Sequence, residues 1–243
     1  MKKIIIVGAS SGIGKEVALR YIGAGWKVGI AARREDSLAD LKLKYPEQVE
    51  YERIDITTVE APDMLHSLIA KLGGMDIYFH CSGVGHQNTK IDTEVELDTV
   101  KTNVYGFTQM VDTAFNYFKQ NKREGHIAVV SSIAGTKGLG VSPSYSATKR
   151  YNYIYLECLE QLARMQNLKI SFTDIRPGFV STALLDDGQH YPAQMTVEYA
   201  CDKIFNAMQK RKRVAIIDWK YAIVVFFWRF IPRWLWVRLP IHT

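Results

Sequence analysis

The chain has 243 residues, of which 47% are hydrophobic and 23% are charged. This length suffices for one sizeable core, and the composition is typical of a soluble globular protein rather than a disordered or fibrous one. The three cysteines, Cys81, Cys158 and Cys201, are far apart and odd in number. They fit neither a disulfide framework nor a metal site, so we expect a cytoplasmic protein that binds no metal.

The net charge of +6 is distributed unevenly along the chain. From Gln209 onward there are eight basic residues and one acid, Asp218, so this segment carries +7 and residues 1–208 carry −1. The body of the protein is therefore nearly neutral, and its end alone makes it basic. We expect one domain over residues 1–218 and an aromatic and basic C-terminal extension over residues 219–243.

Short β-branched runs alternate with longer helical patterns from the start of the chain. Strands are predicted at 3–7, 27–31, 49–53, 77–80, 126–130, 169–174 and 214–217, and helices at 13–24, 35–44, 60–72, 94–119, 144–166 and 197–209. The first apolar run stops after four residues, which is too short for a signal peptide and suits a buried strand. The alternation predicts an α/β fold, a doubly wound, seven-stranded parallel sheet with helices on both faces.

A glycine-rich turn follows the first predicted strand and opens a helix. Gly8 permits a tight turn, Gly12 lets the backbone approach a pyrophosphate, and Gly14 lets helix and strand pack closely. The helix N-terminus adds free N–H groups for phosphates. The turn predicts a dinucleotide site formed by Gly8, Ser10, Ser11, Gly12, Ile13 and Gly14. The alternative is a glycine-rich turn without a ligand.

The spacing Gly-x-x-x-Gly-x-Gly resembles that of the short-chain dehydrogenase/reductase family, and the resemblance covers residues 1 to about 218. It implies a single Rossmann-like domain, a nicotinamide cofactor and hydride transfer between a carbonyl and a secondary alcohol.

Two arginines decide which nicotinamide nucleotide is expected. An acid at the end of the second strand normally accepts a hydrogen bond from the ribose 2′-hydroxyl of NAD. Here Arg33 and Arg34 stand at this place, and the first carboxylate is Glu35. Guanidinium groups bind phosphate through paired N–H donors, so we expect NADP(H). The alternative is a solvated arginine pair in a loop.

Further cofactor contacts are expected where later strands end. Asp55 matches a family aspartate that hydrogen-bonds the adenine amino group, although a strand-end turn would also suit this residue. The family expects Asn-Asn-Ala-Gly after the fourth strand, and this chain has His80-Cys81-Ser82-Gly83. Ser82 and Gly83 can still present backbone to the cofactor. Cys81 is interpreted as a buried small residue, not a nucleophile.

A phenol and an ammonium group, Tyr145 and Lys149, are spaced one helical turn apart on one face. Tyr145 is predicted to be the general acid of a reduction, or the general base of an oxidation, and Lys149 to lower its pKa. By resemblance, Lys149 also binds the nicotinamide ribose. A surface pair is the alternative for this motif alone.

The resemblance adds two more members to this group. Ser132, thirteen residues before Tyr145, would hydrogen-bond the substrate oxygen, with Ser131 as a rival. Asn103 would hold a water that relays protons to Lys149.

The sixth predicted strand is followed by Pro177 and Gly178, with Thr182 four residues on. By resemblance, this turn and the threonine contact the nicotinamide carboxamide. A loop turn with an incidental threonine is the alternative. The segment 181–195 has no clear period and is the natural place for a mobile lid.

Three arginines are interleaved with the many aromatic residues of the C-terminal extension, where the family often has a glycine-rich tail. The apolar run 221–228 is too short to span a bilayer, and Pro232 interrupts any long helix. Rings with arginine suit the headgroup level of a membrane, so residues 219–240 are a candidate membrane-surface contact. The alternatives are a tail folded over the substrate pocket or buried in a dimer interface.

We therefore expect an NADP(H)-dependent oxidoreductase that reduces an apolar or lipid-like ketone. Its partners are expected to be a small-molecule ketone or alcohol and further copies of itself, as a dimer or tetramer, with no nucleic acid; membrane association would be peripheral. The rival hypotheses are a dinucleotide-sensing regulator without turnover and an NAD-linked alcohol oxidation.

Overall fold

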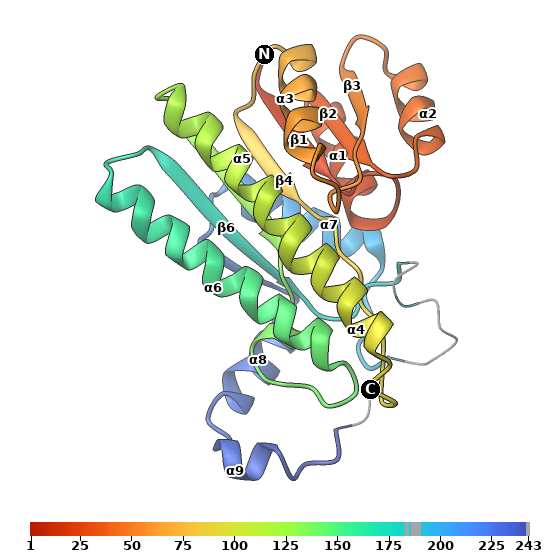
Figure 1. The fold of residues 1–243 in the computed structure, drawn as a ribbon, viewed down its shortest axis with the longest axis vertical. Coiled ribbons are helices and arrows are strands. Elements are labelled where there is room, and N and C mark those ends of the chain that lie inside the picture. Colours follow the sequence, from red (N-terminus) through yellow and green to blue (C-terminus); the bar gives the residue numbers. More distant parts are fainter. Residues whose placement is uncertain (183–184, 186–190, 242–243) are drawn as a thin grey trace.

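The computed structural model describes residues 1–182, 185 and 191–241. Its seven strands form one sheet in the order β3-β2-β1-β4-β5-β6-β7, in which every neighbouring pair is parallel (Figure 1). The strands are β1 (Lys3–Val7), β2 (Lys27–Ala32), β3 (Val49–Arg53), β4 (Ile77–His80), β5 (Gly125–Val130), β6 (Ile170–Pro177) and β7 (Val214–Ile217). The predicted fold class, a seven-stranded doubly wound α/β domain, is confirmed.

Helices cover both faces of this sheet. In chain order the helices are α1 (Gly12–Gly23), α2 (Asp36–Lys44), α3 (Ala61–Leu72), α4 (Thr93–Val100), α5 (Phe107–Gln120), α6 (Pro143–Met165), α7 (Val197–Gln209), α8 (Trp219–Trp228) and α9 (Arg233–Trp236), with short turns η1 (Lys101–Gly106) and η2 (Ile133–Gly135). On one face lie α1, α2 and α7, and on the other lie α3, α5 and α6. Alternate residues of β1 enter different cores: Ile4 and Ile6 pack with α1 and α7, whereas Ile5 and Val7 pack with α3 and α5. This two-residue period is what a strand buried on both sides requires.

One predicted helix is interrupted. Residues 94–119 were expected to form a single helix, but α4 and α5 are joined by the π-helical turn η1. Within η1, the backbone carbonyl of Asn103 accepts a hydrogen bond from Asn152 Nδ2 at 2.8 Å. A π-turn adds a residue to the helical ring and re-aims the side chains it carries. The hydrophobic pattern does not reveal it, because the strong buried face belongs to α5, whereas α4 buries only Thr99.

The prediction placed no helix after residue 217, and the structure forms two. Tyr221 and Val225 of α8 join the core that also holds α1 and α7, and Trp236 of α9 is buried. The sequence signal was obscured because every residue of α8 except Lys220 is apolar, so no amphipathic period is visible. Three strands also differ at their ends: β2 runs to Ala32, β5 begins at Gly125, and β6 runs from Ile170 to Pro177.

The expected lid lies mostly outside the described residues, since 183–184 and 186–190 are not among them. Its two ends are close together, because Val180 and Met195 form an isolated parallel β-bridge. Ser181 N also donates to the carbonyl of Met195 at 2.9 Å.

Candidate functional site

Most of the residues singled out from the sequence lie at the carboxyl edge of the sheet. Because all seven strands are parallel, the turns after β1, β2, β4, β5 and β6 emerge at this one edge. The chain order reverses between β1 and β4, and ligands of open α/β sheets bind in the crevice at such a point.

The glycine turn after β1 is built by close backbone contacts. Gly8 has a φ of +95°, and a Cβ placed there would lie 2.6 Å from the backbone nitrogen of Ser82. A Cβ at Gly14 would lie 2.1 Å from the carbonyl oxygen of Gly8, so the packing role predicted for this glycine matches the structure. Only a residue without a side chain allows these approaches.

The N-terminus of α1 is suited to an anion. Its first turn contains no acidic residue, and in the described structure Ser11 makes no side-chain cap with the helix N–H groups. Gly12 faces Thr182, whose Cγ2 would be 3.2 Å from an added Cβ. Free N–H groups, a positive dipole end and a gap that a side chain would fill are what a pyrophosphate needs.

Arg34 reaches back to this turn from the loop after β2. Its Nη2 donates to Ser10 Oγ at 3.0 Å and to Ser11 Oγ at 2.7 Å. Two hydroxyls and a guanidinium therefore meet at an exposed position beside the helix N-terminus. Such a group of donors fits a ribose phosphate.

Asp55 forms a local turn and faces Arg33. Its Oδ1 accepts from the backbone nitrogen of Thr57 at 2.9 Å and from Thr57 Oγ1 at 2.8 Å. Burial acts to raise the pKa of Asp55, but the Thr57 hydrogen bonds, with Arg33 and Lys101 nearby, hold it below its usual value. The carboxylate is thus kept ionised as an acceptor, with its adenine contact still a prediction.

The turn after β4 brings backbone close to the catalytic candidates. A Cβ at Gly83 would lie 3.2 Å from Asn103 Oδ1 and 3.3 Å from Lys149 Nζ. Burial raises the pKa of the Cys81 thiol to about 12. Cys81 is therefore protonated at neutral pH and unsuited to be a nucleophile. It was predicted to be buried, and it is half-buried and packs against the core.

Asn103 is fixed by this same turn. Its Nδ2 donates to the carbonyl of Val84 at 2.7 Å and to Thr148 Oγ1 at 3.1 Å, while its Oδ1 accepts from the Val84 nitrogen at 2.9 Å. The amide group is thereby held between β4 and α6. It lies beside Lys149, where the sequence predicts it.

The structure separates the two serines after β5. Ser131 Oγ donates to the buried carboxylate of Asp174, which also pairs with Arg176 at 2.6 Å. Ser132 instead forms a hydrogen bond with Tyr145 and accepts from the Ala134 nitrogen at 3.1 Å. Ser131 is thus engaged away from the site, and the geometry favours Ser132 as the substrate-binding hydroxyl.

Tyr145 and Lys149 lie on α6 as the spacing predicts, with Lys149 Nζ 5.7 Å from the centre of the Tyr145 ring. Lys149 is buried and donates to the carbonyl of Val130 at 3.0 Å. Burial lowers its pKa to about 8, against an opposing effect of Asp174.

Burial also raises the pKa of the Tyr145 phenol, and only the hydrogen bond with Ser132 acts to lower it. The expected lowering of this pKa by Lys149 is therefore not observed. Desolvation of the phenolate outweighs a neighbour whose own charge is destabilised by burial.

The turn after β6 revealed a residue that sequence reasoning missed. A Cβ at Gly178 would lie 2.3 Å from the ring of Tyr221, so α8 packs directly on this turn. Tyr221 Oη accepts from the Phe179 nitrogen at 3.2 Å and lies 2.9 Å from the Pro192 carbonyl oxygen. The available signal was an aromatic residue four positions after the last strand. The alternative of a tail folded over the substrate pocket allowed for such a contact but singled out no residue.

Gly85 was also missed. A Cβ at this position would lie 2.6 Å from the Tyr145 ring, so the chain must pass close to the phenol here. Another glycine two residues after Gly83 was the only available signal, and local sequence does not show which ring it approaches.

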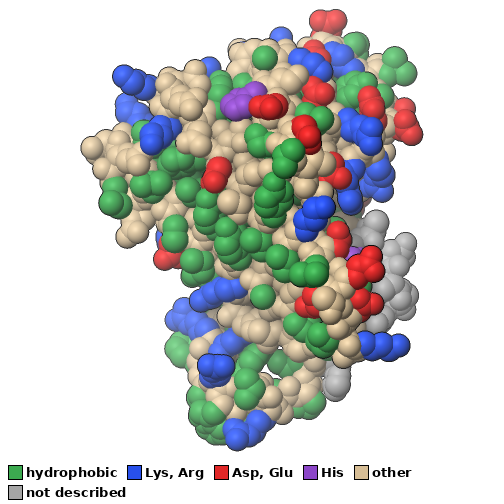
Figure 2. Space-filling view, in the orientation of Figure 1, with side chains coloured by type: hydrophobic (Ala, Val, Ile, Leu, Met, Phe, Trp, Pro, Cys, Tyr) green, Lys and Arg blue, Asp and Glu red, His purple; other side chains and the backbone are tan. Residues whose placement is uncertain are grey.

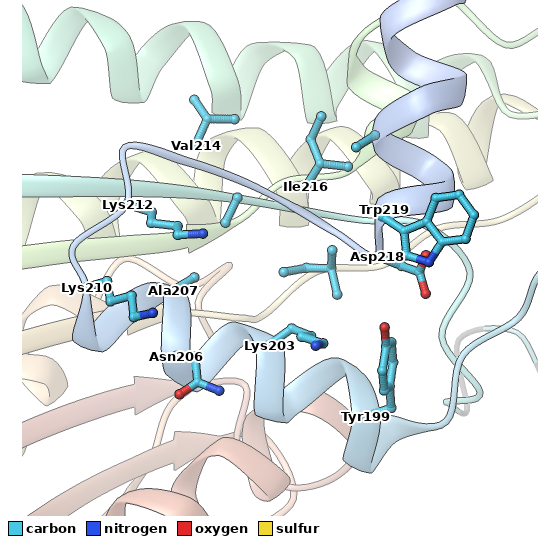
Figure 3. Close-up of a pocket in the computed structure, with 13 residues that line it drawn as sticks. Tyr199, Lys203, Asn206, Ala207, Lys210, Lys212, Val214, Ile216, Asp218 and Trp219 are labelled. Carbon is cyan, nitrogen blue, oxygen red and sulfur yellow. The ribbon is translucent and has the colours of Figure 1, made fainter.

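A separate hollow of about 740 Å³ lies between α7, β7 and α8 (Figure 3). Lys203, Asn206 and Lys210 line one side of it, and Trp219 lies at another. None of the predicted site residues contributes to its lining. The predicted phenol, ammonium, amide and hydroxyl groups converge instead at the carboxyl edge.

Comparisons with known proteins show the family of the chain. A family model described as short chain dehydrogenase matches residues 2–191. Over 242 residues the chain is 26% identical to dehydrogenase/reductase SDR family member 7B of Xenopus tropicalis, covering 88% of this chain and 76% of that protein. Over 254 residues it is 27% identical to an uncharacterized oxidoreductase of Mycobacterium tuberculosis, covering 98% and 94%.

Solved structures show the same fold. A short-chain dehydrogenase from Streptomyces avermitilis superposes with a TM-score of 0.80 at 22% identity, covering 93% of this chain and 91% of that one. ElxO, solved with NADP bound, has a TM-score of 0.78 at 20% identity, covering 91% and 99%. The chain therefore belongs to the short chain dehydrogenase family, and it is an oxidoreductase of the dehydrogenase/reductase type.

Proposed function

We propose that this protein is an NADP(H)-dependent reductase that converts a ketone to a secondary alcohol. The observation that carries the proposal is the convergence of Ser132, Tyr145, Lys149 and Asn103 beside the glycine turn. A regulator that only sensed a dinucleotide would have no use for a protonated phenol and a hydroxyl joined by a hydrogen bond.

The Tyr145 phenol is protonated at neutral pH, as the proton donor of a reduction must be. A phenol that stays protonated at neutral pH can donate its proton to the substrate oxygen as negative charge develops there. Ser132 binds the same oxygen through its hydroxyl and orients it toward the phenol. The bound nicotinamide supplies the hydride.

Lys149 and Asn103 would return a proton to Tyr145 after it has donated its own. With its pKa near 8, Lys149 exchanges protons readily around neutral pH, and it is held by the Val130 carbonyl at the base of the site. Asn103, fixed by Val84, would hold a water on this route. Lys149 would also bind the ribose hydroxyls of the nicotinamide.

The preference for NADP(H) over NAD(H) rests on Arg33 and Arg34. Arg34 already contacts Ser10 and Ser11 at the rim of the turn, and Arg33 lies near Asp55. The remaining contacts would come from Gly8, Gly12, Ile13, Gly14, Ser82, Gly83, Pro177, Gly178 and Thr182. The solved relative with NADP bound is compatible with this choice.

The proposed substrate is apolar, because the tail that packs on the turn after β6 is rich in aromatic rings. Tyr221 packs on Gly178, and Phe179 and Tyr191 pack together with ring centroids 4.6 Å apart. The expected dimer or tetramer and the cytoplasmic location remain predictions.

An NADPH-consumption screen tests the proposal. It would span short ketones, steroids and long-chain keto lipids, with and without detergent, and use Tyr145→Phe as the background. Turnover of an apolar ketone with NADPH supports the function. Tight NADPH binding with no turnover across the panel would favour the sensor, and faster alcohol oxidation with NAD would favour the NAD-linked alternative.

A further inference from the structure

The two C-terminal helices expose an unusual number of large rings. Six apolar side chains, Trp219, Ile223, Phe226, Phe227, Phe230 and Trp234, form what we call the outer face of α8 and α9. Trp219 and Phe227 are each 65% exposed, and Trp234 is 62% exposed. A surface helix normally presents polar residues to water, so this face needs an explanation.

The opposite side of the same helices already has its packing partners. Tyr221, Val225 and Trp228, spaced by four and three residues, face the body of the protein and pack with its core. Trp236 Nε1 donates to the carbonyl of Gly138 at 2.7 Å. The outer face is therefore an additional surface, and the fold of the chain does not require it to be apolar.

Basic residues are placed among these rings. The guanidinium of Arg229 lies 4.8 Å from the Phe226 ring centre and 4.7 Å from that of Phe230, and Arg238 lies 5.8 Å from that of Trp234. The sequence contains no acidic residue after Asp218. In Figure 2 the lobe at the bottom, formed by these helices, shows hydrophobic and basic side chains and no acidic ones.

We propose that the outer face of α8 and α9 docks on the surface of an anionic lipid bilayer. Aromatic rings are favoured at the level of the headgroups, and arginine and lysine are attracted to lipid phosphates at the same depth. Among the described residues, no helix is long and apolar enough to cross a membrane, so the helices would lie along the surface.

The charges of the outer face favour a lipid bilayer as its partner over a second copy of the chain or a nucleic acid. A second copy docking through the same face would bring Lys220, Arg229, Arg233 and Arg238 against their equivalents, with no acid on either side to pair with them. A nucleic acid would satisfy the charges but would not bury so many apolar rings. A lipid surface satisfies both.

The helices α8 and α9, which carry the outer face, lie next to the proposed substrate site. Lys137, in the segment between Ser132 and Tyr145, donates to the Ile231 carbonyl at 2.7 Å and lies 5.3 Å from the Trp236 ring centre. On the other side, Tyr221 binds the backbone after Gly178. Both segments that flank the catalytic group therefore contact the tail. If the proposed ketone reduction is correct, an apolar substrate could pass from the bilayer directly into the site.

Vesicle sedimentation tests the docking, using the full chain and vesicles of phosphatidylcholine alone or with phosphatidylglycerol. We expect binding to the anionic vesicles that weakens as salt increases. Removing the tail is not a suitable test, because Tyr221 and Val225 belong to the core. Instead, Phe227→Gln with Trp234→Gln changes only exposed rings, and the affinity should fall at least about tenfold.

A second pair of substitutions tests the charges. Arg229→Gln with Arg233→Gln should weaken binding to anionic vesicles by roughly thirtyfold at low salt. Lys119→Gln with Lys122→Gln removes the same charge at the opposite edge of the sheet, and Leu43→Gln with Met165→Gln removes exposed apolar residues elsewhere. Both control pairs should bind as the unmodified protein does.

Three outcomes would overturn the docking. They are absence of binding to anionic vesicles at low salt, loss of a dimer rather than of vesicle binding in the tail variants, and tighter binding to duplex DNA than to vesicles. NADPH fluorescence reports folding in every variant. A protein that reduces a water-soluble ketone but ignores vesicles disproves only the docking, and one that binds vesicles but reduces no ketone disproves only the proposed reduction.

Discussion

Most aromatic residues of the body of the protein are buried or partly buried, whereas most of those in its C-terminal tail, residues 219–243, are exposed. In the body, Tyr21, Tyr78, Phe79, Phe107 and Phe118 are fully buried. In the tail, Trp219, Phe226, Phe227, Phe230 and Trp234 are exposed. Residues 209–243, which include the tail, carry a charge of +7, whereas residues 1–208 carry −1. Burial of rings stabilises the fold, whereas exposed rings among arginines indicate a contact outside it.

The catalytic candidates and the exposed rings lie in different parts of the chain, and Tyr221 connects these two parts. The catalytic candidates lie within residues 103–149, and every exposed ring of the outer face of α8 and α9 lies after Asp218. Tyr221 belongs to the tail but packs on Gly178 and binds the Phe179 nitrogen. The tail therefore has an inner side that packs on the turn after β6 and an outer side that carries the exposed rings.

The largest expected effect is that of Tyr145→Phe, which removes the proton donor and keeps the ring. Turnover should fall at least about a hundredfold, because general acid catalysis is lost. NADPH binding by fluorescence and vesicle binding should both persist. Tyr153→Phe, on the same helix but outside the catalytic group, serves as the control and should remain active. Unchanged turnover in Tyr145→Phe would contradict the assignment of the acid.

Arg34→Gln should weaken only the binding of the cofactor NADPH. Loss of a charged hydrogen bond of about 1.5–3 kcal/mol raises the NADPH dissociation constant roughly ten- to a hundredfold. The dissociation constant of NADH should hardly change, and Arg33→Asp should shift the preference further toward NADH. Lys119→Gln is the charge control. A wild-type protein that already prefers NADH would refute the role given to the two arginines.

Lys149 makes the stability of the body depend on pH. Its folded-state pKa is about 8 against an ordinary value of 10.5, so between these values the unfolded chain binds more protons than the folded one. The free energy of unfolding should therefore rise with pH in this window, by up to about 1.4 kcal/mol per pH unit. Denaturant unfolding at pH 7 to 10 would show this rise in the wild type relative to Lys149→Met. Parallel curves for the two proteins would mean that the ammonium is not buried.

The smallest expected effect concerns the inner side of the tail. Tyr221→Phe leaves the Phe179 N–H and the nearby carbonyls without their hydroxyl partner, which should cost about 1–3 kcal/mol of unfolding free energy. The substrate KM should rise several-fold while the NADPH dissociation constant stays constant. Tyr105→Phe, on an exposed tyrosine of η1, is the control. If Tyr221→Phe weakened vesicle binding as much as it raised KM, the inner and outer sides of the tail would not act separately, and this prediction would be contradicted.

Much of the architecture was predictable because it depends on local patterns. The strand-turn-helix at Gly8–Gly14 and the i, i+4 pair Tyr145 and Lys149 are each encoded within a few residues. The break of the helix over Lys101–Gly106 was not predictable, because it accompanies a contact between Asn103 and Asn152, 49 residues apart. The cofactor and catalytic roles themselves remain predictions.

The sequence by itself determined the α/β fold class, the order of the strands along the chain and the unequal charge of body and tail, since composition and periodicity are properties of short segments. Only the tertiary structure decided the direction of the Tyr145 and Lys149 pKa shifts, because desolvation depends on everything that surrounds a group. It also decided which of Ser131 and Ser132 faces the phenol and which side of α8 is covered. An apolar helix carries no pattern that distinguishes its two sides until the body of the protein packs against one of them.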